Sequence, residues 1–122
     1  MKKLIVGIAS YDEIKARTLA IAKGDYMPKR GEPKVWFTSI ESFSKVLSER
    51  NRELLQIIAE HQPEGYKELE RLSGRKKASL SRTLRTMERY GLVRLKKGPE
   101  RKLIPQALYS DVELKLPLHT AH

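Results

Sequence analysis

The amino-acid sequence predicts an α+β fold, and three observations indicate it. Strand-like apolar runs stand near both ends of the chain, segments with helical periodicity lie between them, and Gly and Pro residues separate the segments. With 122 residues, of which 39% are hydrophobic, the chain can bury one modest core. The length therefore allows one domain with a short appended element and excludes a large multidomain enzyme.

Residues 1–34 are expected to form an N-terminal strand–helix extension. The strand covers Lys2–Ile8, and the helix covers about Asp12 to Lys23, with Ser10 suited to cap it. The residues that recur at helical spacing are Ile14, Thr18, Ile21 and Ala22. Gly24 ends the helix, and the Pro-containing stretch 27–33 is typical of a linker. We expect this extension to be the candidate dimerisation surface.

Residues 35–109 are expected to hold four helices and a hairpin. Thr38, with Glu41 three residues later, has the pattern of a capping box and begins a helix that continues to about Leu47. The next helices are predicted from the N-cap Ser48 to near Gln62, at about 66–72 and at about 77–90. Two strands, 92–96 and 103–109, flank a turn that contains Gly and Pro, which is typical of a hairpin.

The C-terminal segment 110–122 contains one more stretch of alternating apolar residues, Val112–Leu116. An isolated strand leaves its backbone groups without partners. We therefore expect this stretch to pair with the strand at Lys2–Ile8, either within one chain or between two.

The positive charge is concentrated in one quarter of the chain. The formal net charge is +10, from 25 Lys and Arg against 15 Asp and Glu. Residues 71–102 hold twelve basic and two acidic residues, and the rest of the chain has thirteen of each, so this segment accounts for the whole excess. Such a concentration indicates a polyanionic partner, whereas an evenly spread excess would indicate only a well-solvated surface.

Two helices joined by a short glycine-containing turn, with a basic hairpin after them, are typical of a winged helix-turn-helix domain. The helical wheel of the last helix supports this interpretation, because its apolar and basic residues separate. One face carries Leu80, Leu84 and Met87, and the opposite face carries Ala78, Arg82, Arg85 and Arg89. The three guanidinium groups are therefore expected to point outward along one line.

The run from Leu72 to Gly98 resembles the DNA-binding core of MarR-like and ArsR-like transcription factors. The matching residues are Leu72, Gly74, Ser79, Leu80, Ser81, Arg82, Leu84, Met87, Glu88, Gly91, Leu92 and Val93. Within that superfamily, the stretch from Trp36 to about Tyr109 looks most like small prokaryotic, often archaeal, winged-helix proteins catalogued as DNA-binding or antitoxin-like regulators. The resemblance implies a transcriptional regulator with a winged helix-turn-helix fold.

We therefore predict a sequence-specific regulator that binds double-stranded DNA as a homodimer. The helix at about 77–90 would enter the major groove, and the wing at about 96–102 would follow the DNA backbone or the adjacent minor groove. The candidate DNA-binding residues are Arg75, Lys76, Lys77, Ser79, Ser81, Arg82, Arg85, Arg89, Lys96, Lys97, Arg101 and Lys102. Arg82 and Arg85 are suited to guanine, and Lys76 and Lys77 to phosphates.

Two other classes of function stay open. The protein could be an antitoxin-like or adaptor protein, whose N-terminal part binds a partner protein while the basic part anchors it to nucleic acid. It could also be a nonspecific chromatin-like or RNA-binding protein. No catalytic motif is present, so we expect no enzyme.

We expect neither a metal nor a cofactor. The absence of cysteine excludes disulfides and thiolate metal sites. The histidines, His61, His119 and His122, are too scattered for a strong metal site, and the last two lack a third ligand. The apolar run Leu4–Ala9 is too short for a secretory signal, and no stretch could cross a membrane. A cytoplasmic protein is therefore expected.

Overall fold

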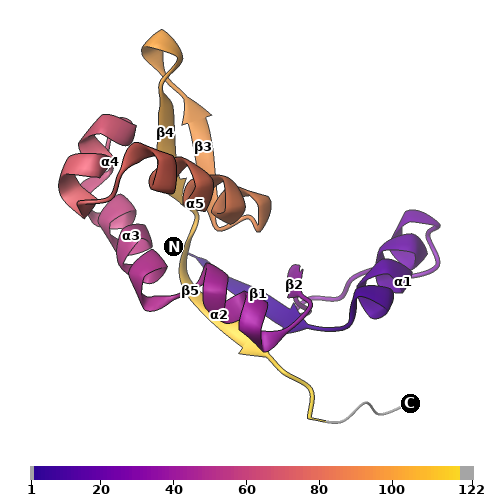
Figure 1. Ribbon diagram of the computed structural model, residues 1–122. Helices are drawn as coiled ribbons and strands as arrows, with labels where there is room; N and C mark the ends of the chain where they lie inside the picture. The colour runs from indigo at the N-terminus through magenta and orange to yellow at the C-terminus, as the bar shows by residue number, and fades with distance from the viewer. Residues whose placement is uncertain (1, 119–122) are drawn as a thin grey trace. The chain divides into compact units, whose positions relative to one another are not determined.

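The computed structural model describes residues 2–118 and has an α+β fold, as predicted (Figure 1). The chain divides into two compact units. The first, which we call the helical unit, comprises residues 45–110 with Lys2; the second, which we call the sheet unit, comprises residues 3–44 and the segment that begins at Asp111. The structure divides the chain between residues 44 and 45 and between residues 110 and 111, whereas the predicted boundaries lie at 34/35 and 109/110.

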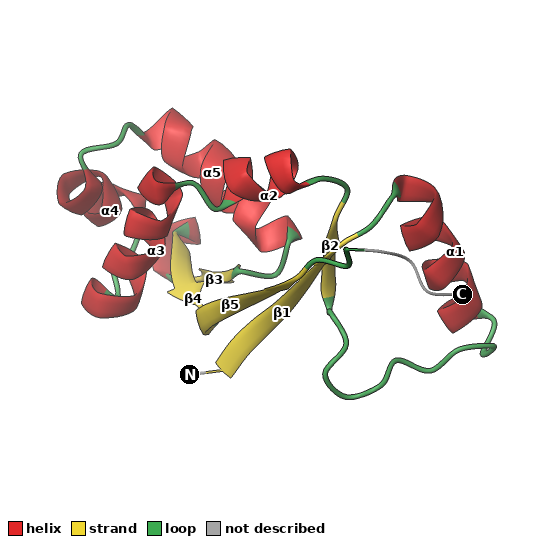
Figure 2. Ribbon diagram, turned by 90° about the horizontal axis from the view of Figure 1, so that it is seen from below, coloured by secondary structure: helices red, strands yellow, loops and turns green. Residues whose placement is uncertain are grey.

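The sheet unit is built on a three-stranded sheet, in which β1 (Lys2–Ile8) lies between β2 (Val35–Phe37) and β5 (Tyr109–Lys115) (Figure 2). β1 and β2 are parallel, in the register Val6↔Val35, Gly7↔Trp36 and Ile8↔Phe37. A parallel pair needs a crossover connection, and the chain from residue 9 to residue 34 supplies it. The predicted pairing of the C-terminal stretch with the first strand is confirmed within one chain, whereas β2 was not predicted.

Helix α1 (Tyr11–Ala22) begins and ends one residue before the predicted bounds and has the predicted cap, and none of its residues is buried. The Ser10 hydroxyl accepts a hydrogen bond from the backbone N–H of Glu13 at 3.1 Å, so the N-cap prediction is confirmed. None of the residues of α1 is buried, and Thr18, Ile21 and Ala22 are exposed. The residues that recur at helical spacing therefore form no buried face among the described residues.

A polar and aromatic cluster connects α1 to the loop that follows it. The Arg17 guanidinium lies 5.2 Å from the ring centroid of Tyr26 and 5.4 Å from that of Trp36. It also forms an ion pair of 3.1 Å with Glu32, whose carboxylate accepts a hydrogen bond from the Tyr26 hydroxyl. These contacts hold the loop against one side of α1 and β2.

Helix α2 (Ile40–Val46) starts at a different cap from the one predicted. The Ser39 hydroxyl accepts a hydrogen bond from the backbone N–H of Ser42 at 3.0 Å, so the cap is Ser39 and not Thr38. The ring of Phe43 packs edge-on against the buried Phe37, with ring centroids 5.4 Å apart. This pair anchors α2 to the end of β2.

The helical unit contains α3 (Glu49–His61), α4 (Tyr66–Ser73), α5 (Lys77–Arg89) and an antiparallel hairpin of β3 (Val93–Lys97) and β4 (Leu103–Ala107). α3 packs on α4 and β4, and α5 packs on α4 and β3. The fully buried side chains of these elements include Leu54, Ile58, Leu69, Leu80, Leu84, Met87 and Val93. Burial of one such Leu, Ile, Met or Val side chain stabilises the unit by about 1.5 to 3 kcal/mol relative to leaving that side chain exposed to water.

The ends of these elements follow local signals. Ser48 caps α3 by accepting a hydrogen bond from the N–H of Asn51 at 3.2 Å, as predicted. Gly74 adopts a left-handed conformation with φ of 73° and lets the chain turn from α4 into α5. The predicted strand 103–109 is divided, because β4 ends at Ala107 and the chain enters β5 after Leu108. No helix within residues 2–118 is long and apolar enough to cross a bilayer.

Candidate functional site

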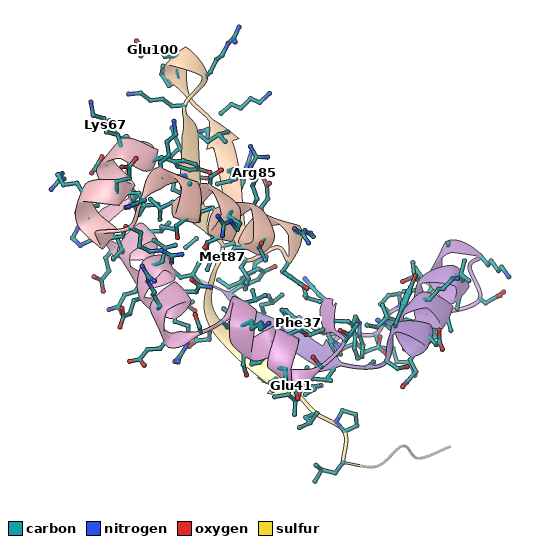
Figure 3. All side chains as sticks on the ribbon, viewed as in Figure 1. Phe37, Glu41, Lys67, Arg85, Met87 and Glu100 are labelled. Carbon is teal, nitrogen blue, oxygen red and sulfur yellow. The ribbon has the colours of Figure 1, made fainter. Side chains whose placement is uncertain are left out.

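α5 presents a row of arginines on the face opposite its buried side. Leu80, Leu84 and Met87 are completely buried, whereas Arg82, Arg85 and Arg89 are exposed. Figure 3 shows the contrast, since Arg85 and Met87 lie on opposite sides of α5. The predicted separation of the two faces is confirmed. The row exists because the helical period places residues 82, 85 and 89 within one narrow stripe.

The hairpin carries a second group of exposed cations around its turn. The turn contains the 3-10 helix Pro99–Arg101, with positive φ at Glu100 and Arg101, and it is closed by a bond of 2.7 Å from the Gly98 N–H to the Lys102 carbonyl. Glu100 lies at the tip (Figure 3). The exposed basic residues of the hairpin turn and its flanks are Lys96, Lys97, Arg101 and Lys102. Because β3 packs against α5, these cations belong to the same unit as the arginine row.

We call the exposed cations among the predicted contacts the basic surface. Its members are Lys76, Lys77, Arg82, Arg85, Arg89, Lys96, Lys97, Arg101 and Lys102. In the described part of the chain, the ion pairs join Lys3 to Glu113 and Arg17 to Glu32, both in the sheet unit. None of them involves the basic surface. Its positive charge is therefore not neutralised by carboxylates in contact with it.

Arg75 is the exception among the predicted contacts. Its side chain is buried, with only 9% of its surface exposed, and its guanidinium donates to side chains of the helical unit. Burial lowers its pKa from the ordinary value, and the nearby charge of Arg50 lowers it further. The prediction that Arg75 faces nucleic acid is therefore corrected: this side chain lies inside the fold.

The two predicted serines are half-buried on the flanks of α5. The Ser79 hydroxyl accepts a hydrogen bond from the Arg75 guanidinium at 3.0 Å, which the sequence did not indicate. Ser81 lies one residue before the arginine row and is partly accessible. Apart from Arg75 and Ser79, ten contacts were predicted: nine of them are exposed, and the tenth, Ser81, is half-buried.

Tyr66, the first residue of α4, is near enough to Arg85 for the two side chains to interact electrostatically, and it was not predicted as a site residue. Burial raises the pKa of its hydroxyl; the Arg85 charge acts in the opposite direction, and the Glu88 charge raises it. The hydroxyl oxygen is buried and has no hydrogen-bond partner within the described residues. A tyrosine at the start of a helix carries no sequence signal for this environment, which depends on tertiary packing.

Two further features of the structure were considered as possible metal-binding or catalytic sites. No cluster of metal-binding side chains occurs within residues 2–118. His119 and His122, for which no metal site was expected, lie outside the described residues. A cavity of about 330 Å³ lies between α3 and β4, lined by Ile58, Ala59, Gln62, Pro63, Ile104, Pro105, Gln106, Ala107 and Leu108. None of its lining side chains is ionisable. Neither feature supplies a general acid, a general base or a nucleophile.

The comparisons with known proteins identify a family and nothing more detailed. A family model described as HVO_A0114 matches residues 46–114, which is more than half of the chain and includes α3, α4, α5 and the hairpin. No curated protein and no solved structure is significantly similar to the chain. The matched region contains the whole basic surface. The chain belongs to the HVO_A0114 family.

Proposed function

We propose that the helical unit is a MarR-like winged helix-turn-helix domain and that the protein is a sequence-specific, double-stranded DNA-binding transcriptional regulator. In this proposal α4 and α5 form the helix-turn-helix, α5 is the recognition helix and the hairpin is the wing. The observation that carries the proposal is the exposed row of Arg82, Arg85 and Arg89, with which no carboxylate of residues 2–118 forms an ion pair. This function needs no catalytic group, metal or cofactor.

The dimensions of α5 suit the major groove. A helix of 13 residues is about 20 Å long, and the major groove of B-DNA is about 12 Å wide and admits one helix. Ala78 at the start of α5 is small and exposed, so the helix backbone can approach the base edges there. Arg82 and Arg85 are then the candidates for bidentate bonds to guanine, each worth about 1 to 3 kcal/mol of discrimination.

The wing would contribute affinity more than specificity. Its exposed cations surround a tight turn, and Lys and Arg side chains in that arrangement bind phosphates or enter the minor groove. Each phosphate contact releases counterions, so binding to DNA should weaken steeply as salt increases. A single recognition helix reads few base pairs, so we propose a homodimer that reads two half-sites.

The test is to select duplexes from a random DNA pool and to measure affinities by fluorescence anisotropy. The selected duplex, a random duplex and a structured RNA are titrated at several salt concentrations. We expect the selected duplex to bind at least tenfold more tightly than the other two. Equal affinity for all three would contradict sequence-specific regulation and would favour a nonspecific nucleic-acid-binding protein.

A charge-matched pair of variants connects the binding to the basic surface. Arg85→Ala removes one positive charge from the arginine row, and Lys15→Ala removes one from α1, where Lys15 is exposed. Arg85→Ala should weaken binding to the selected duplex by about tenfold or more, and Lys15→Ala should change it little. Equal losses in both variants would show that net charge alone drives binding.

One observation favours a second candidate, an antitoxin-like or adaptor protein with a protein partner. α1 exposes 61% of Tyr11 and 49% of Leu19 and has no buried residue. Exposed apolar side chains on a helix are typical of protein–protein contacts. Co-purification of one untagged protein in a fixed ratio, abolished by Leu19→Asp, would support this candidate over a homodimer.

A further inference from the structure

Arg75 joins two helices that are not consecutive in the helical unit. It lies in the turn between α4 and α5, and its guanidinium donates to Asn51 Oδ1 of α3 at 3.0 Å. The same guanidinium donates to Ser79 Oγ at 3.0 Å and to Thr83 Oγ1 at 2.7 Å, both on α5. One side chain thus fixes the position of α5 against α3 through three hydrogen bonds.

Asn51 extends this network to the segment before α3. Its amide nitrogen donates to the backbone carbonyls of Lys45 at 3.4 Å and Val46 at 3.1 Å. Its amide oxygen is therefore turned toward Arg75, and both ends of the amide have partners. We call Asn51, Arg75, Ser79 and Thr83 the Arg75 network.

The Arg75 network requires a guanidinium in particular. All three of its acceptors are neutral oxygens, and within residues 2–118 no carboxylate forms an ion pair with Arg75. A guanidinium is planar and directs its donors along fixed, divergent directions, whereas a lysine ammonium concentrates three donors at one point. Lysine could not reach acceptors on both α3 and α5 with the same geometry.

The bond from Arg75 also determines how Ser79 can bond to a third group. A guanidinium has donors only, so the Ser79 oxygen must accept from it, and the Ser79 hydroxyl proton must point elsewhere. Ser79 is half-buried on the flank of α5, between the exposed arginine row and the buried seam. Its hydroxyl proton is therefore available to a third group.

We propose that Arg75 is a positioning residue for DNA recognition: it fixes α5 against α3 and orients Ser79 as a hydrogen-bond donor. This inference rests on the function proposed above. A Ser79 donor would favour acceptors such as purine N7, guanine O6, thymine O4 or a phosphate oxygen, and would disfavour the amino groups of adenine and cytosine. Arg75 would thus affect which sequence is bound without touching DNA.

The test measures the ratio between affinity for the selected duplex and affinity for the random duplex, under conditions where circular dichroism shows each variant to be folded. Arg75→Lys keeps the charge, and Arg75→Met keeps much of the length without it. Both should reduce the ratio by about tenfold, the loss of one well-placed contact. Neither should change the salt dependence of binding to the random duplex, because Arg75 does not contact phosphate.

Lys76→Met is the control for a direct contact, since Lys76 is the exposed neighbour of Arg75. Lys76→Met should weaken binding to all duplexes alike. It should also reduce the slope of log affinity against log salt concentration by about one. If Arg75→Lys retains the full ratio, or if Arg75→Met reduces the salt dependence as Lys76→Met does, the positioning role is overturned.

A second pair of variants tests the network if the Arg75 variants do not fold. Thr83→Val removes one acceptor while conserving the side-chain shape, and it should reduce the ratio partially. Ser79→Ala combined with Thr83→Val should lose less than the sum of the single losses, because Thr83 acts through Arg75 on the Ser79 donor that Ser79→Ala already removes. Losses that add independently would overturn the proposal.

The outcomes separate this inference from the proposed function. If the wild-type protein shows no preference among duplexes, the proposed function fails, and the positioning role fails with it. If the wild type shows a preference that the Arg75 and Thr83 variants retain, the proposed function stands and the positioning role alone is rejected.

Discussion

The ring of Trp36 occupies the space where a Cβ would stand on Gly7, its partner in the parallel β1–β2 pair. A Cβ at Gly7 would be 2.5 Å from Cζ3 of Trp36 and 2.9 Å from Cγ of Pro33, closer than real atoms approach. We therefore expect Gly7→Ala to lower the free energy of unfolding by about 1 to 3 kcal/mol, measured by urea denaturation. Gly98→Ala is the comparison, because its Cβ would meet the mobile end of Ile104, and its cost should be smaller. Equal losses in the free energy of unfolding for the two variants would show that the Trp36 ring moves aside.

Glu32 should make the α1 loop sensitive to acid. The Tyr26 hydroxyl bond, followed by the backbone N–H of Lys29 and the Arg17 guanidinium, holds the pKa of Glu32 below its ordinary value of 4.5, and burial offsets part of this effect. A lowered pKa in the folded state stabilises the loop above the ordinary value, and this stabilisation is lost as the pH falls through the folded pKa. The fluorescence of Trp36, the single tryptophan, should change over that range.

Two variants identify the carboxylate that causes the change in fluorescence. Glu32→Gln should abolish it, because the amide does not titrate. Glu113→Gln should leave it in place, although the hydrogen bond and charge of Lys3 also hold the pKa of Glu113 below its ordinary value. A change that persists in Glu32→Gln and disappears in Glu113→Gln would assign the acid sensitivity to the other ion pair.

Leu84→Ala should destabilise the helical unit because Leu84 is completely buried on the core face of α5. The expected loss is about 2 to 5 kcal/mol in the free energy of unfolding, from lost burial and the cavity that remains. Arg82→Ala, two residues earlier on the exposed face, should change the free energy by no more than about 0.5 kcal/mol. Thermal denaturation of both variants measures the difference, and similar losses would contradict the assignment of the two faces.

Arg82 and Lys97 should affect DNA binding in different ways. Arg82→Ala should relax the preference between bases by about 1 to 3 kcal/mol, because its guanidinium is proposed to contact guanine. Lys97→Ala should weaken binding to all sequences alike and reduce the slope of log affinity against log salt concentration by about one. Titrations of the selected and random duplexes at several salt concentrations separate the two effects. The reverse pattern would exchange the proposed roles of α5 and the hairpin.

Leu19→Asp should affect the oligomeric state. Leu19 is about half exposed on α1, which belongs to the dimerisation surface that the sequence predicts for residues 1–34. A buried charge without a partner strongly opposes association, so the variant should sediment as a monomer at tens of micromolar while the wild type sediments as a dimer. Lys15→Ala on the same helix is the control and should remain a dimer. A monomeric wild type would reject the dimer proposal.

Local patterns predicted the helical unit well. The bounds of α3 and α5, the Ser48 cap and the opposed faces of α5 all follow from hydrophobic periodicity and capping residues, which act within one or two turns. The hairpin was also predicted, because its strands flank an obvious Gly-Pro turn. These signals need no knowledge of distant contacts.

Several features that depend on tertiary contacts were missed, although the pairing of β5 with β1 was predicted. β2 has three residues and exists through pairing with β1, so no periodicity can reveal it. Thr38 and Ser39 can both cap a helix, and the sequence alone does not choose between them. Arg75 looks like its basic neighbours in the sequence, and its burial depends on the acceptors that Asn51 and Thr83 bring from other turns.

The chain moves from β4 to β5 across the single residue Leu108, and this continuity matters for dissecting the protein. A truncated protein that ends just after the hairpin would lack β5, and β1 would then have an unpaired edge. Such an edge invites self-association, so a truncated product that aggregates would report the missing strand and not an unstable helical unit. Fragments for crystallisation or NMR should therefore keep the residues through Lys115.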